Sequence, residues 1–219
     1  MDLLIFDLDG TLVDSKLDLA ISVNAALAAS GRPTLDDELI QSYVGNGAPI
    51  LIRRAVGPEA SGAEVKSVLK LFMEHYAEHL LDNTDVYPGI RESLDRFRAA
   101  GKKMAVLTNK PTSLSLSLVN GLDLQDYFFR VYGGDSLPEK KPHPLAVERL
   151  LEESAVAKEN ALMIGDSSVD ILTARNAAIA AAGVTYGFKP ETLNAPPPDI
   201  LVDRMEELVQ IVFQRCTSS

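Results

Sequence analysis

Asp7 and Asp9 stand directly after a short apolar run and are the residues of this sequence best placed to do chemistry. The run Leu3-Leu4-Ile5-Phe6 is typical of a strand buried on both faces of a sheet. Ligands of open α/β sheets bind beyond the carboxyl ends of such strands, so both carboxylates are expected at a site. Two like charges this close repel each other unless a cation or a shared proton lies between them. The pair therefore predicts a bound metal ion or a shared proton, although an ordinary Asp-Gly turn explains this segment equally well when it is taken alone.

Three further polar clusters follow in a fixed order, and two of them come directly after apolar runs. The clusters are Thr108-Asn109-Lys110 after residues 103–107, Lys140-Lys141-Pro142, and Gly165-Asp166-Ser167-Ser168-Val169-Asp170 after residues 161–164. Four such segments in this order resemble the haloacid dehalogenase-like superfamily of aspartate-nucleophile phosphohydrolases. The resemblance covers nearly the whole chain and makes an isolated turn a poor explanation of the first segment.

The resemblance implies a catalytic set of Asp7, Asp9, Thr108 and Lys141. Asp7 would attack phosphorus and form a phosphoaspartate. Asp9 would protonate the leaving alkoxide and then accept a proton from the hydrolytic water. True haloacid dehalogenases lack this second aspartate, so Asp9 favours phosphate over halide. Thr108 and the backbone N–H of Asn109 would hold the phosphoryl oxygens, and Lys141 would neutralise their charge.

The same resemblance implies a magnesium site. Its ligands would be Asp7, the Asp9 carbonyl and Asp166, while Asp170 would bind directly or through water. Oxygen-only ligands fit Mg²⁺, which is typically held by one or two carboxylates together with water and substrate phosphate. The competing interpretation of the Asp166–Asp170 segment is an ordinary helix cap.

Within the superfamily, the chain is most similar to the phosphoglycolate phosphatase family. The similarity rests on Tyr43-Val44-Gly45-Asn46-Gly47-Ala48-Pro49, Thr108-Asn109-Lys110-Pro111-Thr112, Gly133-Gly134-Asp135, Lys140-Lys141-Pro142-His143-Pro144 and Thr185-Tyr186-Gly187. It implies hydrolysis of 2-phosphoglycolate to glycolate and phosphate. A glycine loop lets backbone approach a small substrate closely. The expected substrate contacts are Gly10, Thr11, Gly45, Asn46, Gly47 and Asn109.

Two arginines and one histidine carry weaker hypotheses. Arg53 or Arg54 could pair with a substrate carboxylate, but arginines on helices are more often solvated. His143, beside Lys141, is interpreted as structural rather than catalytic.

Other functions remain open at this level. A phosphatase of broader specificity, acting on pyrophosphate, nucleotides or sugar phosphates, would have the same core residues. A phosphomutase would share the phosphoaspartate but exclude water from it. A non-catalytic phosphate-binding protein is a weaker alternative, because such a protein is expected to have lost Asp7, Asp9 or Lys141.

The pattern of elements predicts an α/β fold, a Rossmann-like doubly wound parallel sheet with an inserted α-helical cap domain. Strands are expected near 3–7, 103–107, 129–133, 161–164 and 181–185, helices near 90–100, 112–121, 142–153 and 168–178, and a final strand and helix within 199–213. Residues 16–85 contain no strand-like run and show helical stripes, one of them closed by Gly31. The catalytic core would therefore comprise 1–15 and 86–219, and the cap 16–85, with hinges at 12–16 and 82–89.

Composition limits the partners. The formal net charge of the 219 residues is −10, which argues against nucleic acid and anionic membranes because both attract basic surfaces. The expected partner is a small phosphorylated metabolite. The sequence contains a single cysteine, Cys216, which we interpret as a bystander in a reducing compartment. No leader or membrane-spanning run is recognised, so a cytoplasmic protein is expected, either a monomer or a homodimer.

Overall fold

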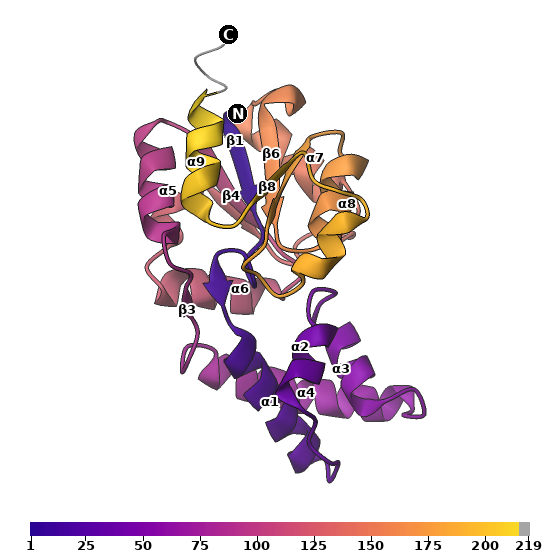
Figure 1. Ribbon diagram of the computed structural model, residues 1–219. Helices are drawn as coiled ribbons and strands as arrows, with labels where there is room; N and C mark the ends of the chain where they lie inside the picture. Colours follow the sequence, from indigo (N-terminus) through magenta and orange to yellow (C-terminus); the bar gives the residue numbers. More distant parts are fainter. Residues whose placement is uncertain (215–219) are drawn as a thin grey trace.

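Six parallel strands form one sheet in this computed structural model, which describes residues 1–214 (Figure 1). The strand order is β5-β4-β1-β6-β7-β8. The strands are β1 (Leu3–Phe6), β4 (Lys103–Leu107), β5 (Arg130–Tyr132), β6 (Ala161–Gly165), β7 (Ala180–Val184) and β8 (Ile200–Val202). The central strand β1 pairs in parallel with β4 on one side and β6 on the other, so the chain changes direction across the sheet at β1.

Helices cover both faces of the sheet because side chains alternate along each strand. Leu4 and Phe6 of β1 enter one apolar cluster, and Leu3 and Ile5 enter another. The first cluster includes α5 (Ile90–Ala99), α6 (Thr112–Gly121) and α9 (Met205–Gln214), and the second includes α7 (Leu145–Ser154) and α8 (Ser168–Asn176). The doubly wound α/β fold is thus confirmed. Short 3₁₀ turns at Gln125–Tyr127, Lys158–Asn160 and Pro190–Asn194 complete this part.

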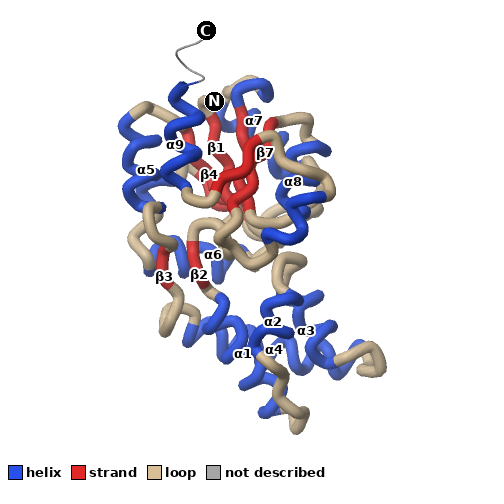
Figure 2. Tube along the Cα trace, viewed as in Figure 1, coloured by secondary structure: helices blue, strands red, loops and turns tan. Residues whose placement is uncertain are grey.

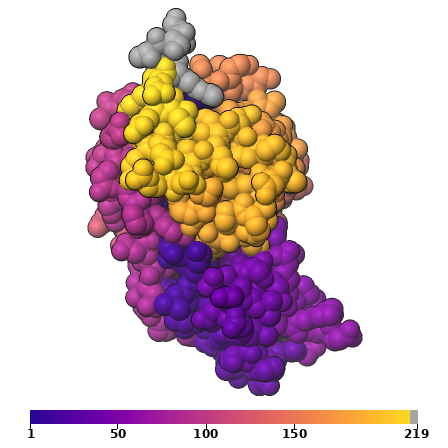
Figure 3. All heavy atoms as spheres, in the orientation of Figure 1, coloured from indigo at the N-terminus to yellow at the C-terminus, as the bar shows by residue number. Residues whose placement is uncertain are grey.

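Four helices are inserted between β1 and α5. They are α1 (Lys16–Ala29), α2 (Asp37–Tyr43), α3 (Ala48–Val56) and α4 (Gly62–His79). We call them the helical insertion; Figure 3 shows it, in indigo to purple, as a lobe beside the rest of the molecule. Its interior is apolar, and Val23 of α1 and Phe72 of α4 are buried. The sequence pattern did not predict α2, whose one buried residue, Ile40, provides no helical periodicity.

Two short strands connect the insertion to the sheet. β2 (Val13–Asp14) and β3 (Asp85–Val86) pair antiparallel and lie between the two lobes (Figure 2). The Asp18 carboxylate, 2% exposed, joins the two connections. It accepts hydrogen bonds from the backbone N–H groups of Asn83 and Thr84, from the Asn83 amide and from the Thr84 hydroxyl, at 2.7–3.1 Å. Among residues 1–214, no helix is both long enough and apolar enough to cross a membrane.

We expect Asp18→Asn to destabilise the fold by about 2 to 3 kcal/mol, because the amide places a donor against N–H groups that need an acceptor. Burial raises the pKa of Asp18, but the hydrogen bonds from Asn83 and Thr84 outweigh burial and hold this pKa below its usual 3.8. The carboxylate therefore stabilises the folded state fully above pH 3.8, and this contribution is lost as pH falls through the lower folded-state pKa.

Urea unfolding of both proteins at pH 7 and pH 3 measures this difference. The exposed Asp126→Asn serves as the matched control and should change little. An Asp18→Asn protein as stable as the unmodified chain at pH 7 would contradict the assigned role.

Candidate active site

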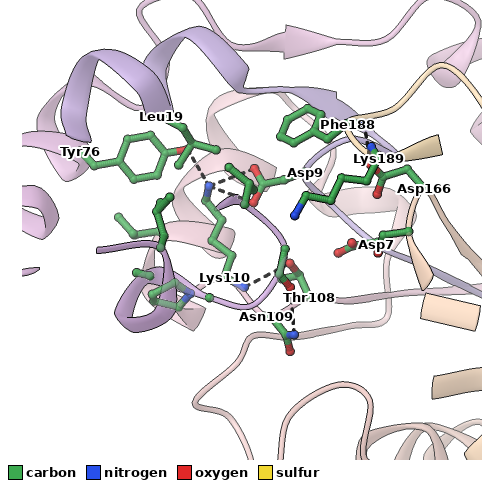
Figure 4. A pocket seen from close by; sticks show the side chains of 18 of the residues that line it. Asp7, Asp9, Leu19, Tyr76, Thr108, Asn109, Lys110, Asp166, Phe188 and Lys189 are labelled. Carbon is green, nitrogen blue, oxygen red and sulfur yellow. Dashed lines mark hydrogen bonds and ion pairs between the residues drawn. The ribbon is translucent and has the colours of Figure 1, made fainter. Parts of the chain in front are cut away.

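The residues predicted to do chemistry meet at the carboxyl edge of the sheet. Asp7 follows β1, Thr108 follows β4 and Asp166 follows β6, and these strands are neighbours. All three residues line one cavity, which the helical insertion closes on the opposite side (Figure 4). The site lies where the strand order reverses, as expected for an open α/β sheet.

Lys141 is buried between two of the carboxylates. Its ammonium lies 2.9 Å from Asp7 Oδ1 and 2.6 Å from Asp170 Oδ1. Burial opposes the charged form of Lys141, but attraction to Asp170 and then to Asp7 outweighs it and raises the lysine pKa. Asp7 Oδ1 also accepts a hydrogen bond from the Leu8 N–H at 2.8 Å. The orientation of the Asp7 carboxylate is therefore fixed before any ligand binds.

Three carboxylates share this buried space. Asp7, Asp166 and Asp170 each offer an oxygen within 4.8 Å of the others. Burial and the charge of Asp170 raise the pKa of Asp7 to about 7, although Lys141 partly offsets them. Burial, then Asp170 and Asp7, raise the pKa of Asp166 to about 8. A cation at this point would relieve both repulsion and desolvation.

The donor set fits a hard divalent cation. All three side chains offer oxygen, and none of the three is exposed. Asp166 has no cationic partner among the described residues; its Oδ2 accepts the backbone N–H groups of Phe188 at 2.6 Å and Lys189 at 3.3 Å. Asp170 also caps α8, since its Oδ2 accepts from the Ser167 hydroxyl and N–H. The carboxylate of Asp9 is not part of this group.

Asp9 turns instead towards Lys110, to which the sequence motifs assign no role. Lys110 Nζ lies 3.0 and 3.2 Å from the two Asp9 carboxylate oxygens, and the Ser15 hydroxyl donates to Asp9 Oδ1 at 2.5 Å. Lys110 also donates to the Tyr76 hydroxyl of α4 at 2.6 Å. Burial lowers the pKa of Lys110, but Asp9 and Tyr76 outweigh burial and raise it. The same burial raises the pKa of Tyr76 to about 12, so the phenol stays protonated.

Thr108 and Asn109 form the polar wall between Asp7 and Lys110. Thr108 is buried, and its hydroxyl accepts the Lys110 N–H at 3.2 Å. The Asn109 amide donates to the carbonyls of Gly45 and Lys141, both at 3.1 Å. No described residue accepts the Asn109 backbone N–H, so this group is available to a ligand oxygen.

The glycine loop of the insertion rests on the sheet-side residues. Gly45 and Gly47 line the cavity, whereas Asn46 does not; the Asn46 carbonyl accepts from Lys140 at 2.7 Å. Gly47 has φ +89°, and a Cβ there would lie 2.9 Å from the Asn109 carbonyl oxygen. Glycine is therefore required at position 47 for both backbone conformation and space.

Some residues expected at the site lie outside the cavity lining. Gly10 packs beside Asp166, and the carbonyl of the buried Thr11 accepts from the Tyr186 hydroxyl. Arg53 donates to the Ala60 carbonyl, and Arg54 to that of Tyr43, both within the insertion. His143 is exposed and accepts the Leu145 N–H, while Cys216 lies outside the described residues.

Two cavity residues carried no recognisable sequence signal. Phe188 and Lys189 follow the Thr185-Tyr186-Gly187 string and reach the site because their N–H groups bind Asp166. Burial, together with the charge of nearby Arg54, lowers the pKa of Lys189. The Thr185-Tyr186-Gly187 string indicated this loop in the sequence. Only the three-dimensional arrangement shows that Phe188 and Lys189, which follow it, line the cavity.

Fold and site together define a doubly wound α/β protein with a candidate carboxylate nucleophile at the switch point of its sheet. The sequence model of the family described as haloacid dehalogenase-like hydrolase matches residues 4–184. The chain belongs to this family.

Named relatives agree with this placement. A phosphoglycolate phosphatase of Vibrio parahaemolyticus is 39% identical over 217 residues, 96% of this chain and 95% of the relative. One from Chromobacterium violaceum is 40% identical over 212 residues, 94% of each chain. A crystal structure of a predicted phosphoglycolate phosphatase from Haemophilus somnus has a TM-score of 0.90 and 34% identity, and covers 96% of this chain and 97% of that one. The resemblance inferred from the motifs is confirmed.

A double-mutant cycle tests whether Lys110 and Asp9 interact as the structure places them. We expect Lys110→Met and Asp9→Asn to show a coupling of about 1 to 3 kcal/mol in urea unfolding, because the pair is largely buried. The exposed Arg98–Asp95 pair provides the matched control cycle and should give about 0.2 to 1 kcal/mol. Equal coupling in the two cycles would mean that Asp9 and Lys110 are not held together in solution.

Proposed function

We propose that this hydrolase is a Mg²⁺-dependent phosphatase that converts 2-phosphoglycolate to glycolate and phosphate through a phosphoaspartate on Asp7. The observation that carries the proposal is the arrangement of Asp7 against Lys141, Asp166 and Asp170 in one buried cluster at the cavity floor. The names of the relatives support both the phosphatase class and this substrate. The expected cytoplasmic location and small-metabolite partner belong to the same proposal.

Asp7 is the proposed nucleophile. Lys141 and the Leu8 N–H both bind Oδ1, and no described residue donates to Oδ2. Attack on phosphorus forms an Asp7–phosphoryl bond and breaks the ester P–O bond. Thr108 and the Asn109 N–H are placed to hold the phosphoryl oxygens as the substrate lies against Asp7.

Asp9 is the proposed acid and base. The Asp9 carboxylate pairs with Lys110 in the free protein, so it must take up a proton as the substrate binds. It then gives this proton to the leaving alkoxide in the first half of the reaction and takes one from the attacking water in the second. Water then breaks the Asp7–phosphoryl bond and releases phosphate. Lys110 and Ser15 act as positioning residues, because their contacts fix the direction of the Asp9 carboxylate.

Asp7 and Asp166 would hold the magnesium ion, and the Asp9 carbonyl is the expected backbone ligand. Asp170 would bind the ion directly or through water. When bound, the ion neutralises phosphoryl charge. Asp170 also holds Lys141 in place, which gives this residue a role at the site whether or not it binds the metal directly.

Residues 16–85 are proposed as a cap domain over this chemistry, and residues 1–15 and 86–219 as the catalytic core. The cap supplies Gly45, Gly47, Leu19 and Tyr76 to the cavity lining. A closed cap excludes water other than the one that reacts. Gly10, Thr11 and Asn46 remain expected substrate contacts only if the site rearranges when the ligand binds.

We expect Asp7→Asn to abolish phosphate release from 2-phosphoglycolate, because an amide is a poor nucleophile, while the fold survives. The measurement is phosphate release from a panel of phosphomonoesters, with circular dichroism as the folding control. Turnover of the Asp7→Asn protein near that of the unmodified enzyme would refute the covalent mechanism. Stronger activity on pyrophosphate, nucleotides or sugar phosphates would favour the broader phosphatase, and isomerisation without phosphate release would favour a phosphomutase.

Metal dependence can be tested by unfolding as well as by activity. At ten times its dissociation constant, Mg²⁺ should stabilise the folded protein by about 1.4 kcal/mol. Asp166→Asn should remove this stabilisation by Mg²⁺. The exposed Asp126→Asn is the control and should retain it. Activity should vanish in chelator and return with Mg²⁺ but not with Ca²⁺, which accepts more ligands and bidentate carboxylates. Full activity in excess chelator would overturn the magnesium assignment.

A further inference from the structure

Lys189 differs from the other lysines at the cavity. Lys141 is paired with Asp7 and Asp170, and Lys110 with Asp9. Within residues 1–214, no hydrogen bond or ion pair involves the ammonium of Lys189, although this half-buried side chain lines the same cavity. In Figure 4 its terminal nitrogen points into the cavity towards Asp7 and Asp9. A cation held in this way is suited to an anion that enters from solution.

The ammonium of Lys189 lies on the insertion side of the cavity. A Cβ built on Gly45 would lie 4.0 Å from Lys189 Nζ. Lys141, by contrast, lies beneath Asp7 and is almost completely buried. A phosphomonoester whose phosphorus is in contact with Asp7 must extend its leaving group away from Asp7, because the attacking and leaving oxygens are in line. That direction leads towards the insertion loop and Lys189.

The backbone of Lys189 is fixed relative to the catalytic carboxylates. Its N–H and that of Phe188 bind Asp166 Oδ2, and its carbonyl accepts both the N–H and the hydroxyl of Thr192, at 3.0 and 2.8 Å. The side chain therefore starts from an anchored position and not from a free loop, so less conformational entropy is lost when it binds a ligand.

We propose that Lys189 is the specificity residue that binds a carboxylate on the leaving group of the substrate. The inference rests on the proposed function and names the residue that recognises the second anionic group. The insertion side of the lining is otherwise largely apolar, with Leu19, Val44, Leu51 and Phe72. Arg53 and Arg54, the candidates suggested by the sequence, bind carbonyls of the insertion and are absent from this lining.

The test compares substrates that differ by a carboxylate. For Lys189→Met, we expect kcat/KM on 2-phosphoglycolate to fall about 10- to 100-fold, the value of one charge-assisted hydrogen bond. Ethyl phosphate, which has the same number of carbons and no carboxylate, should change by less than about twofold. Lys189→Arg should recover part of the preference. Lys16→Met removes a charge beside Phe188 but outside the lining, and should leave the ratio of the two substrates unchanged.

The outcomes separate this inference from the proposed function. Equal losses on both substrates would mean that Lys189 supports the Asp166 loop, and no loss would mean that it contacts neither substrate; either result overturns the inference. If the unmodified enzyme ignores 2-phosphoglycolate, the proposed substrate fails. The pair 3-phosphoglycerate and glycerol phosphate then tests Lys189 in the same way. If the enzyme prefers the carboxylate-bearing substrate in neither pair, the inference about Lys189 is overturned, while the proposed phosphatase activity still stands.

Discussion

Burial of three carboxylates together, with one lysine paired to two of them, is the constraint on which the rest of this structure depends. Asp7, Asp166 and Asp170 lose hydration together, and Lys141 compensates only part of their charge. The surrounding backbone is built to allow this approach. A Cβ on Gly165 would lie 2.1 Å from the Asp170 carboxyl carbon, and one on Gly187 would lie 2.2 Å from Asp166 Cβ. The cluster is stable as a whole only if a cation joins it or a proton is retained, which is why the site is suited to binding a metal and an anion together.

The sequence predicted most of the sheet because each strand is a short apolar run between polar ends. β1 and β6 are buried throughout, so their composition alone distinguishes them from the amphipathic helices. Helices with long apolar stripes, such as α4, were equally visible. The two-residue strands β2 and β3 and the short helix α2 were not, because they are too short for periodicity and form through tertiary contacts such as those of Asp18.

The motif residues of the site could be predicted because they stand at the ends of neighbouring parallel strands, where geometry brings them together. Lys110 and Lys189 could not. The positioning role of Lys110 follows from its contacts with Asp9 and Tyr76, which lie far from it in the sequence. Lys189 depends on a loop that folds back onto Asp166. Pairings of this kind follow from how the two lobes and the last loops pack, and no local pattern encodes them.

The contacts between the insertion and the sheet-side residues suit a part that must admit substrate. Among residues 1–214, three hydrogen bonds cross at the cavity: Asn109 to the Gly45 carbonyl, Lys140 to the Asn46 carbonyl, and Lys110 to the Tyr76 hydroxyl. In each, the sheet side donates and the insertion accepts. Water can replace either partner, and losing each of these bonds costs the closed arrangement about 0.5 to 1.5 kcal/mol. The bonds of Asp18 lie at the connection itself and need not break. Movement of the helical insertion about β2 and β3 would release Lys110 from Tyr76 while Asp9 keeps its ion pair, so the candidate acid and base would stay oriented.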